Sequence, residues 1–146
     1  MGKTFAAIKK VAFADDDSEV LAIFDEYGFN VKKDLKNIHV AEEEKERIRE
    51  GILDALRDNR GVTVIHKSPN NIVTVIKMRA AGGNGRGESG GFRVYLICGI
   101  LPDSAVIFHI YPKTGSKRKD NISQKEKNKI CKLADDLDGS VKRRQS

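Results

Sequence analysis

Apolar side chains recur at helical spacing twice near the start of the chain, after a short stretch, Ala6–Phe13, that favours a strand. The first expected helix follows three consecutive aspartates and stops at Gly28, a residue typical of helix C-termini. The second opens at Glu42 with three glutamates in its first turn and ends at Gly61. Residues 29–40 fit no single pattern. The pattern therefore predicts two N-terminal helices and leaves one segment undecided.

Alternation of apolar and polar residues then replaces the helical spacing. Four β-rich runs follow, separated by turn residues, at Val62–His66, Ile72–Arg79, Phe92–Cys98 and Ala105–Tyr111. A last helix opens with Ser123 and Glu126 in capping-box spacing and is expected to end before Gly139. This order predicts an α+β fold, with an antiparallel meander sheet packed against the N-terminal helices and a C-terminal helix. The length fits one domain, 1–140, followed by a flexible basic tail, 141–146.

Alternate positions of the last three strands separate into two sets. The apolar set, expected to face the core, is Ile72, Thr74, Ile76, Met78, Phe92, Val94, Leu96, Cys98, Val106, Phe108 and Ile110. The opposite set is Lys77, Arg79, Arg93, Tyr95, His109 and Tyr111. Because alternate side chains of a strand share a face, the second set predicts one surface of cations and aromatic rings without a carboxylate. Such a surface suits phosphate contact and base stacking on single-stranded RNA, and the alternative is a solvated face with scattered charges.

The net charge of +6 is unevenly placed. Residues 1–60 hold 11 basic and 14 acidic residues, a balance of −3, so the acidic groups are expected to lie away from the basic face. Residues 61–132 hold 13 basic and 4 acidic residues, a balance of +9, which is typical of a surface that binds a polyanion. The expected sequence-independent phosphate contacts beyond the strands are Lys113, Lys117, Arg118, Lys119, Lys125, Lys127, Lys129 and Lys132.

Other functional classes find little support. Cys98 and Cys131 lack disulfide or metal spacing, and the three histidines lack ligand spacing, so neither a metal nor a cofactor is expected. Gly85–Gly90 matches the letters G-x-G-x-x-G, but a strand follows it where a dinucleotide site needs a helix. That linker is expected to hold Arg86 near the basic face. No apolar run approaches membrane-spanning length and no signal peptide is evident, so a cytoplasmic location is expected.

Five short motifs, read together, resemble the RelE/ParE superfamily of toxins. They are a Lys-x-Arg strand end (Lys77, Arg79), an Arg-Gly-x-Ser-Gly-Gly linker (Arg86–Gly91), an Arg-Val strand (Arg93, Val94), Ile-Tyr-x-Lys (Ile110–Lys113) and a Ser-x-x-Glu helix start (Ser123–Glu126). The similarity covers residues 72–137 and is greatest to the HigB-like branch. It implies the toxin of a type II toxin–antitoxin pair, bound by a cognate antitoxin and cleaving mRNA in the 30S A site of the ribosome. Other branches of the superfamily inhibit gyrase.

The resemblance and the chemistry of RNA cleavage together suggest roles for the basic residues. Without a metal, the 2′-hydroxyl attacks its neighbouring phosphate, which requires a base, an acid and cations for the developing charge. We expect Arg79, Arg86 and Arg93 to bind phosphate, and Tyr111 and Lys113 to transfer protons. The remaining expected RNA contacts are Lys77, Tyr95, His109, Lys117, Arg118 and Lys119, of which Lys77 and His109 are also reserve proton carriers. Two alternatives stay open: a gyrase-inhibiting toxin, and a nucleic-acid-binding module without catalysis.

Overall fold

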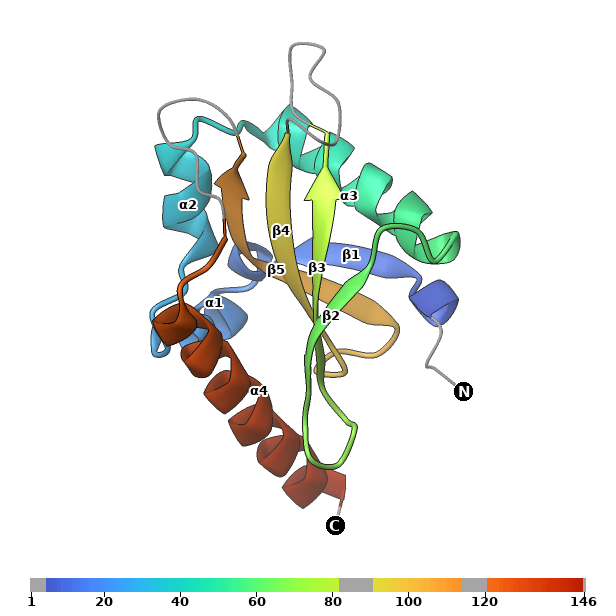
Figure 1. Cartoon of the computed structure of the whole chain (residues 1–146), viewed down its shortest axis with the longest axis vertical. Coiled ribbons are helices and arrows are strands. Elements are labelled where there is room, and N and C mark those ends of the chain that lie inside the picture. The colour runs from blue at the N-terminus through green and yellow to red at the C-terminus, as the bar shows by residue number, and fades with distance from the viewer. Residues whose placement is uncertain (1–4, 82–90, 114–120, 146) are drawn as a thin grey trace.

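The computed structural model describes residues 5–81, 91–113 and 121–145, with side chains as far as residue 140. Figure 1 shows one twisted sheet flanked by helices. In chain order, the elements are the 3-10 helix η1 (Phe5–Ala7), β1 (Lys10–Phe13), the 3-10 helix η2 (Ala14–Asp16), α1 (Ser18–Asp25), α2 (Val31–Asn37), α3 (Glu42–Arg57), β2 (Thr63–Lys67), β3 (Thr74–Ala80), β4 (Phe92–Cys98), β5 (Ser104–Pro112) and α4 (Gln124–Gln145).

The sheet has five strands in the order β1-β5-β4-β3-β2. Strands β2 to β5 form the antiparallel meander that the alternation predicted, and the α+β class is confirmed. The sheet is mixed rather than antiparallel throughout, because β1 adds to its edge in parallel to β5, with Lys10 opposite Ser104 and Phe13 opposite Ile107. A parallel pair needs a long connection, which here contains α1, α2, α3 and the other three strands. Alternation within a strand carries no information about such a distant partner.

Helices cover both faces of the sheet. The helix α3 packs against β1 and β3, and α4 packs against β2 and β3 on the opposite face (Figure 1). The apolar residues of α4 that make this contact, Ile130, Leu133 and Ala134, are fully buried. The sheet beneath α4 must be apolar as well, and Val75 and Ile97 are buried there. The face that carries the cations is thus polar over only part of its length.

A bulge in β5 changes the face of one residue expected in the apolar set. His109 pairs with Tyr95, but the next residue of β4, Leu96, pairs with Ile107. Val106 therefore lies opposite Ile97, on the face of Tyr95, and its expected position beside Ile110 is wrong. A bulge inserts an extra residue into one strand and reverses the alternation beyond it. The apolar run of β5 gives no sign of that reversal in the sequence.

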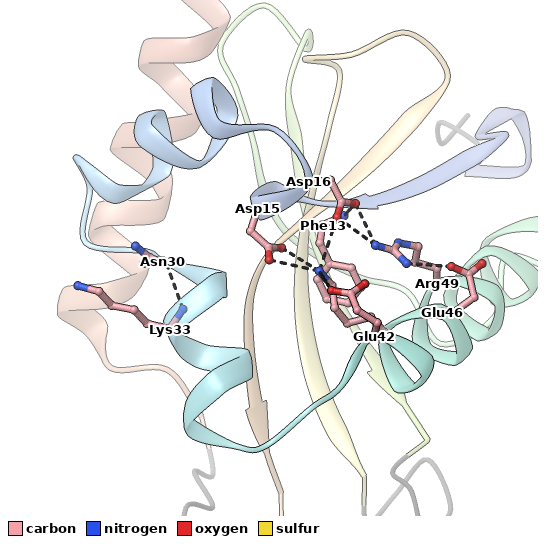
Figure 2. Close-up of polar contacts among 9 residues, drawn as sticks. Phe13, Asp15, Asp16, Asn30, Lys33, Glu42, Glu46 and Arg49 are labelled. Carbon is pink, nitrogen blue, oxygen red and sulfur yellow. Dashed lines mark hydrogen bonds and ion pairs between the residues drawn. The ribbon is translucent and has the colours of Figure 1, made fainter.

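The undecided segment after Gly28 forms the short helix α2 along the edge of β5. Asn30 caps this helix, since its side chain accepts a hydrogen bond from the Lys33 backbone amide at 3.1 Å (Figure 2). Asp34, one turn further, accepts from the Ile110 backbone amide at 3.4 Å. That amide lies beyond the part of β5 that pairs with β1. The helix therefore takes the place of a neighbouring strand there.

Two basic residues of α3 fasten this helix to the start of the chain. Lys45 is buried, and its ammonium lies 3.2 Å from Asp15 and 3.6 Å from Asp16, while Arg49 pairs with Asp16 at 3.0 Å. Figure 2 shows Asp15, Asp16 and Arg49 converging between η2 and α3. Both cations also lie over the ring of Phe13, at 4.8 and 5.1 Å from its centroid. Ion pairs and cation–π contacts therefore stabilise the same junction between α3 and the start of the chain.

The last helix starts as predicted and ends later than predicted. Glu126 donates its backbone amide to the Ser123 hydroxyl at 3.1 Å and accepts from the Ser123 amide at 3.0 Å, which is a complete capping box. The expected end before Gly139 is wrong, since α4 continues to Gln145. Asp138 supplies a reason. This buried carboxylate accepts hydrogen bonds from the Ser68 hydroxyl and, at 3.0 Å, from a backbone amide of the β2–β3 turn, and so holds the helix in place beyond that point.

Candidate nucleic-acid interface

The six polar residues expected on one face do share it. The strand register places Lys77, Tyr95 and His109 in one cross-strand row. Arg79, Arg93 and Tyr111 form the next row. Directly opposite residues of antiparallel strands point to the same side of the sheet, with their Cβ atoms about 5 Å apart. The prediction that these six residues share one side of the sheet is confirmed.

Four cations gather at one end of this face. Lys113 follows β5 and is anchored there, because its backbone amide donates to the Gly91 carbonyl at 2.9 Å. Burial lowers the pKa of Lys77, and the positive charge of Lys113 lowers it further. Arg93 and Arg79 act on Lys77 in the same direction. Like charges close enough to perturb one another favour an anionic ligand, since the ligand relieves their mutual repulsion.

Of the aromatic members of the set, the two tyrosines are buried and His109 is partly buried, so they do not form an open stacking surface. Tyr95 is 1% exposed and Tyr111 is 5% exposed. The ring centroids of Tyr95, His109 and Tyr111 lie 5.7 to 6.1 Å apart, and the two tyrosine hydroxyls lie 3.4 Å apart. Burial and the bond to Tyr111 raise the pKa of Tyr95 above its usual range. In this conformation Tyr95 cannot stack on a nucleotide base, and its expected role as a direct RNA contact is wrong.

Two carboxylates flank His109, where sequence reasoning expected none. Asp34 of α2 lies 3.0 Å from Nδ1, and Glu126 of α4 lies 3.7 Å from Nε2. The expectation that acidic residues lie away from the basic face is therefore wrong at this point. Asp34 belongs to the segment without a clear pattern, and the spacing of Glu126 from Ser123 indicates only a helix cap. Both reach the histidine through tertiary packing that a single sequence does not report.

The cations differ in how much surface they offer to a ligand. Arg79 is exposed, Lys77 and Lys113 are partly buried, and Arg93 is only 5% exposed. Burial lowers the pKa of Arg93, and the neighbouring charge of Arg79 lowers it further. The α4 lysines expected to contact phosphate, Lys125, Lys127, Lys129 and Lys132, are exposed. The expected contacts Arg86, Lys117, Arg118 and Lys119 lie outside the described residues.

Comparison of the chain with protein-family models, with curated proteins and with solved structures finds no match. Within the described ranges, no helix has the length and apolar content needed to cross a membrane. Any function assigned to this chain must therefore be inferred from its own residues and their arrangement.

Proposed function

We propose that this chain is the toxin of a RelE/ParE-type toxin–antitoxin pair, in its HigB-like branch, and that it cleaves mRNA on the ribosome. One observation carries the proposal. Three adjacent strands bring Lys77, Arg79, Arg93 and Lys113 to one end of one sheet face. Their charges lie close enough to lower the pKa of Lys77 and of Arg93. The sequence motifs that resemble this superfamily contain the same four residues. The proposed partners are a cognate antitoxin, mRNA and the 30S A site.

The proposed reaction is an internal transesterification of RNA. The 2′-hydroxyl loses its proton to a base and attacks the adjacent phosphorus, and the 5′-oxygen leaves with a proton from an acid. The products are a 2′,3′-cyclic phosphate and a 5′-hydroxyl. Lys77 is the proposed base, because its lowered pKa increases the fraction of free amine at neutral pH. Protonated Lys113 is the proposed acid.

The two arginines have complementary roles in this proposal. Arg79 is exposed and meets the incoming phosphate, whereas the buried Arg93 faces the charge that develops on the phosphoryl oxygens. Tyr111 lies beside Arg93 in the same row, and its hydroxyl lies close to that of Tyr95. We assign the two tyrosines and His109 to positioning the cations. Both tyrosines are buried, so the proposal gives them no direct contact with the bases.

The test is to express the protein in growing bacteria and to map new RNA 5′ ends in translated messages. Wild-type protein is expected to arrest growth and to produce cuts within reading frames. Arg79→Ala is expected to abolish both, while Arg57→Ala, an exposed arginine that pairs with Asp54 on α3, is expected to leave both unchanged. Growth arrest without cuts would instead favour the gyrase-inhibiting alternative. Absence of both would favour a binding module.

A further inference from the structure

A hollow of about 320 Å³ lies beside the cationic face, between the end of α3 and the edge strands. The pairing of β2 with β3 stops at Thr63 and Lys77, whereas β3 continues to Ala80. The chain that joins α3 to β2 turns away through Asn59 and Gly61, which have φ angles of +50° and +69°. Figure 1 shows this connection passing beside the end of β3. The hollow occupies the place where a longer β2 would have paired.

The groups that line this hollow suit a phosphate. They include two guanidinium side chains, an amide and a hydroxyl, from Arg60, Arg79, Asn59 and Thr63. No carboxylate is among the described lining residues. Guanidinium groups bind phosphate through paired, charge-assisted hydrogen bonds. The volume is at the lower end of the range for small-molecule sites, which is enough for one nucleotide's sugar and phosphate.

The end of α3 would oppose an anion, because a helix C-terminus carries partial negative charge. Its carbonyl groups are already engaged. The Arg60 amide donates to Ala55 at 2.8 Å, and the Asn59 amide donates to Leu56 at 3.1 Å. The helix dipole is confined to the last turn of α3, whereas the hollow is also lined by Arg60 and Arg79.

Arg79 belongs both to the hollow and to the cationic face of the sheet. It lines the hollow and is also the cross-strand partner of Arg93. Resting on the proposed function, we propose that Arg60 and Arg79 form a subsite for a backbone phosphate of single-stranded RNA that flanks the phosphate held at Arg93. An RNA strand would then cross the sheet from β5 toward the end of α3. The subsite adds affinity that depends on substrate length.

The test uses purified protein and fluorescent single-stranded RNA of two and six nucleotides, with affinities measured by anisotropy between 50 and 200 mM salt (about the range in which phosphate contacts dominate). Wild-type protein is expected to bind the longer RNA more tightly. Arg60→Ala is expected to weaken hexanucleotide binding roughly fivefold and to reduce the salt slope by about 0.7, the value for one phosphate of a single strand. It is expected to leave dinucleotide binding unchanged. Arg57→Ala, three residues earlier on α3, is the matched control.

Two results would overturn the subsite. One is equal hexanucleotide binding by Arg60→Ala and the control, and the other is an equal loss for both RNA lengths. The in-cell mapping separates this failure from that of the proposed function. If wild-type protein cuts no translated message, the proposed function fails. If it cuts messages while Arg60→Ala retains the full length dependence, only the subsite fails.

Discussion

Replacing Lys45 by methionine should cost about 3 kcal/mol of unfolding free energy. The Lys45 side chain is 5% exposed, and its closest partner, Asp15, is 13% exposed, while the third carboxylate, Glu42, is 84% exposed. Methionine keeps the apolar stem against Phe13 but leaves Asp15 buried without its cation. Removing one partner of a buried ion pair costs about 3–5 kcal/mol. We expect the lower end, because Glu42 is exposed to water and Asp16 keeps its ion pair with Arg49.

Urea unfolding followed by circular dichroism measures this cost. With a slope of about 2 kcal/mol per molar urea, the midpoint should fall by roughly 1.5 M. Lys132→Met is the matched control, since that lysine pairs with Asp136 at 3.4 Å but its side chain is 71% exposed. Its loss should be no more than about 0.5 kcal/mol. Adding Asp15→Asn to Lys45→Met should recover part of the stability. Equal midpoints for the two lysine variants would refute the reasoning.

Substitutions at Arg79, Asp138 and Gly99 provide three further tests. Arg79→Gln removes a positive charge that lowers the pKa of Lys77, so that pKa should rise. The pH profile of any residual cleavage should then shift to higher pH than in the wild type. An unchanged pH profile would exclude Lys77 as the base. Burial raises the pKa of Asp138, but hydrogen bonds from Ser68 and Asn70 outweigh it and lower that pKa below 3.8. The contribution of Asp138 to stability is therefore present above that pH and is lost as the pH falls. Asp138→Asn should flatten the acid limb of a plot of melting temperature against pH. Gly99 has a φ of +103° and a backbone oxygen 1.9 Å from where a Cβ would stand, so Gly99→Ala should lower the free energy of unfolding by more than about 3 kcal/mol. Gly51 lies within α3 with open space where a Cβ would stand, so Gly51→Ala should raise that free energy by about 0.5–1 kcal/mol in the same urea assay.

The sequence predicts the elements best where local rules decide them. The bounds Phe92–Cys98 agree with β4 at both ends, because alternation and flanking glycines define that strand locally. The capping box at Ser123 likewise depends only on residues within one turn. The helix α2 was left undecided because it has only seven residues and depends on its contact with β5. Helices of that length have little stability of their own.

The sequence predicts which face of the sheet carries the candidate site, but not how deeply its residues are buried. Alternation is enough to place Arg93 and Tyr111 on one face, because it follows from strand geometry alone. Each is only 5% exposed, and that burial depends on tertiary packing, which alternation does not report. The carboxylates beside His109 come from helices 92 residues apart in the chain, at Asp34 and Glu126, and no local rule connects them. Alternation therefore predicts which residues share a face, but not their burial or the carboxylates beside them.

The cations of β3, β4 and the end of β5 are proposed to bind and cut RNA. The most direct measurement is to incubate purified protein with ribosomes translating a defined message and to analyse the ends of the fragments. We expect cuts that carry a 5′-hydroxyl and a 2′,3′-cyclic phosphate, and that disappear with Arg79→Ala. An intact message, or identical cutting by the variant, would contradict the claim.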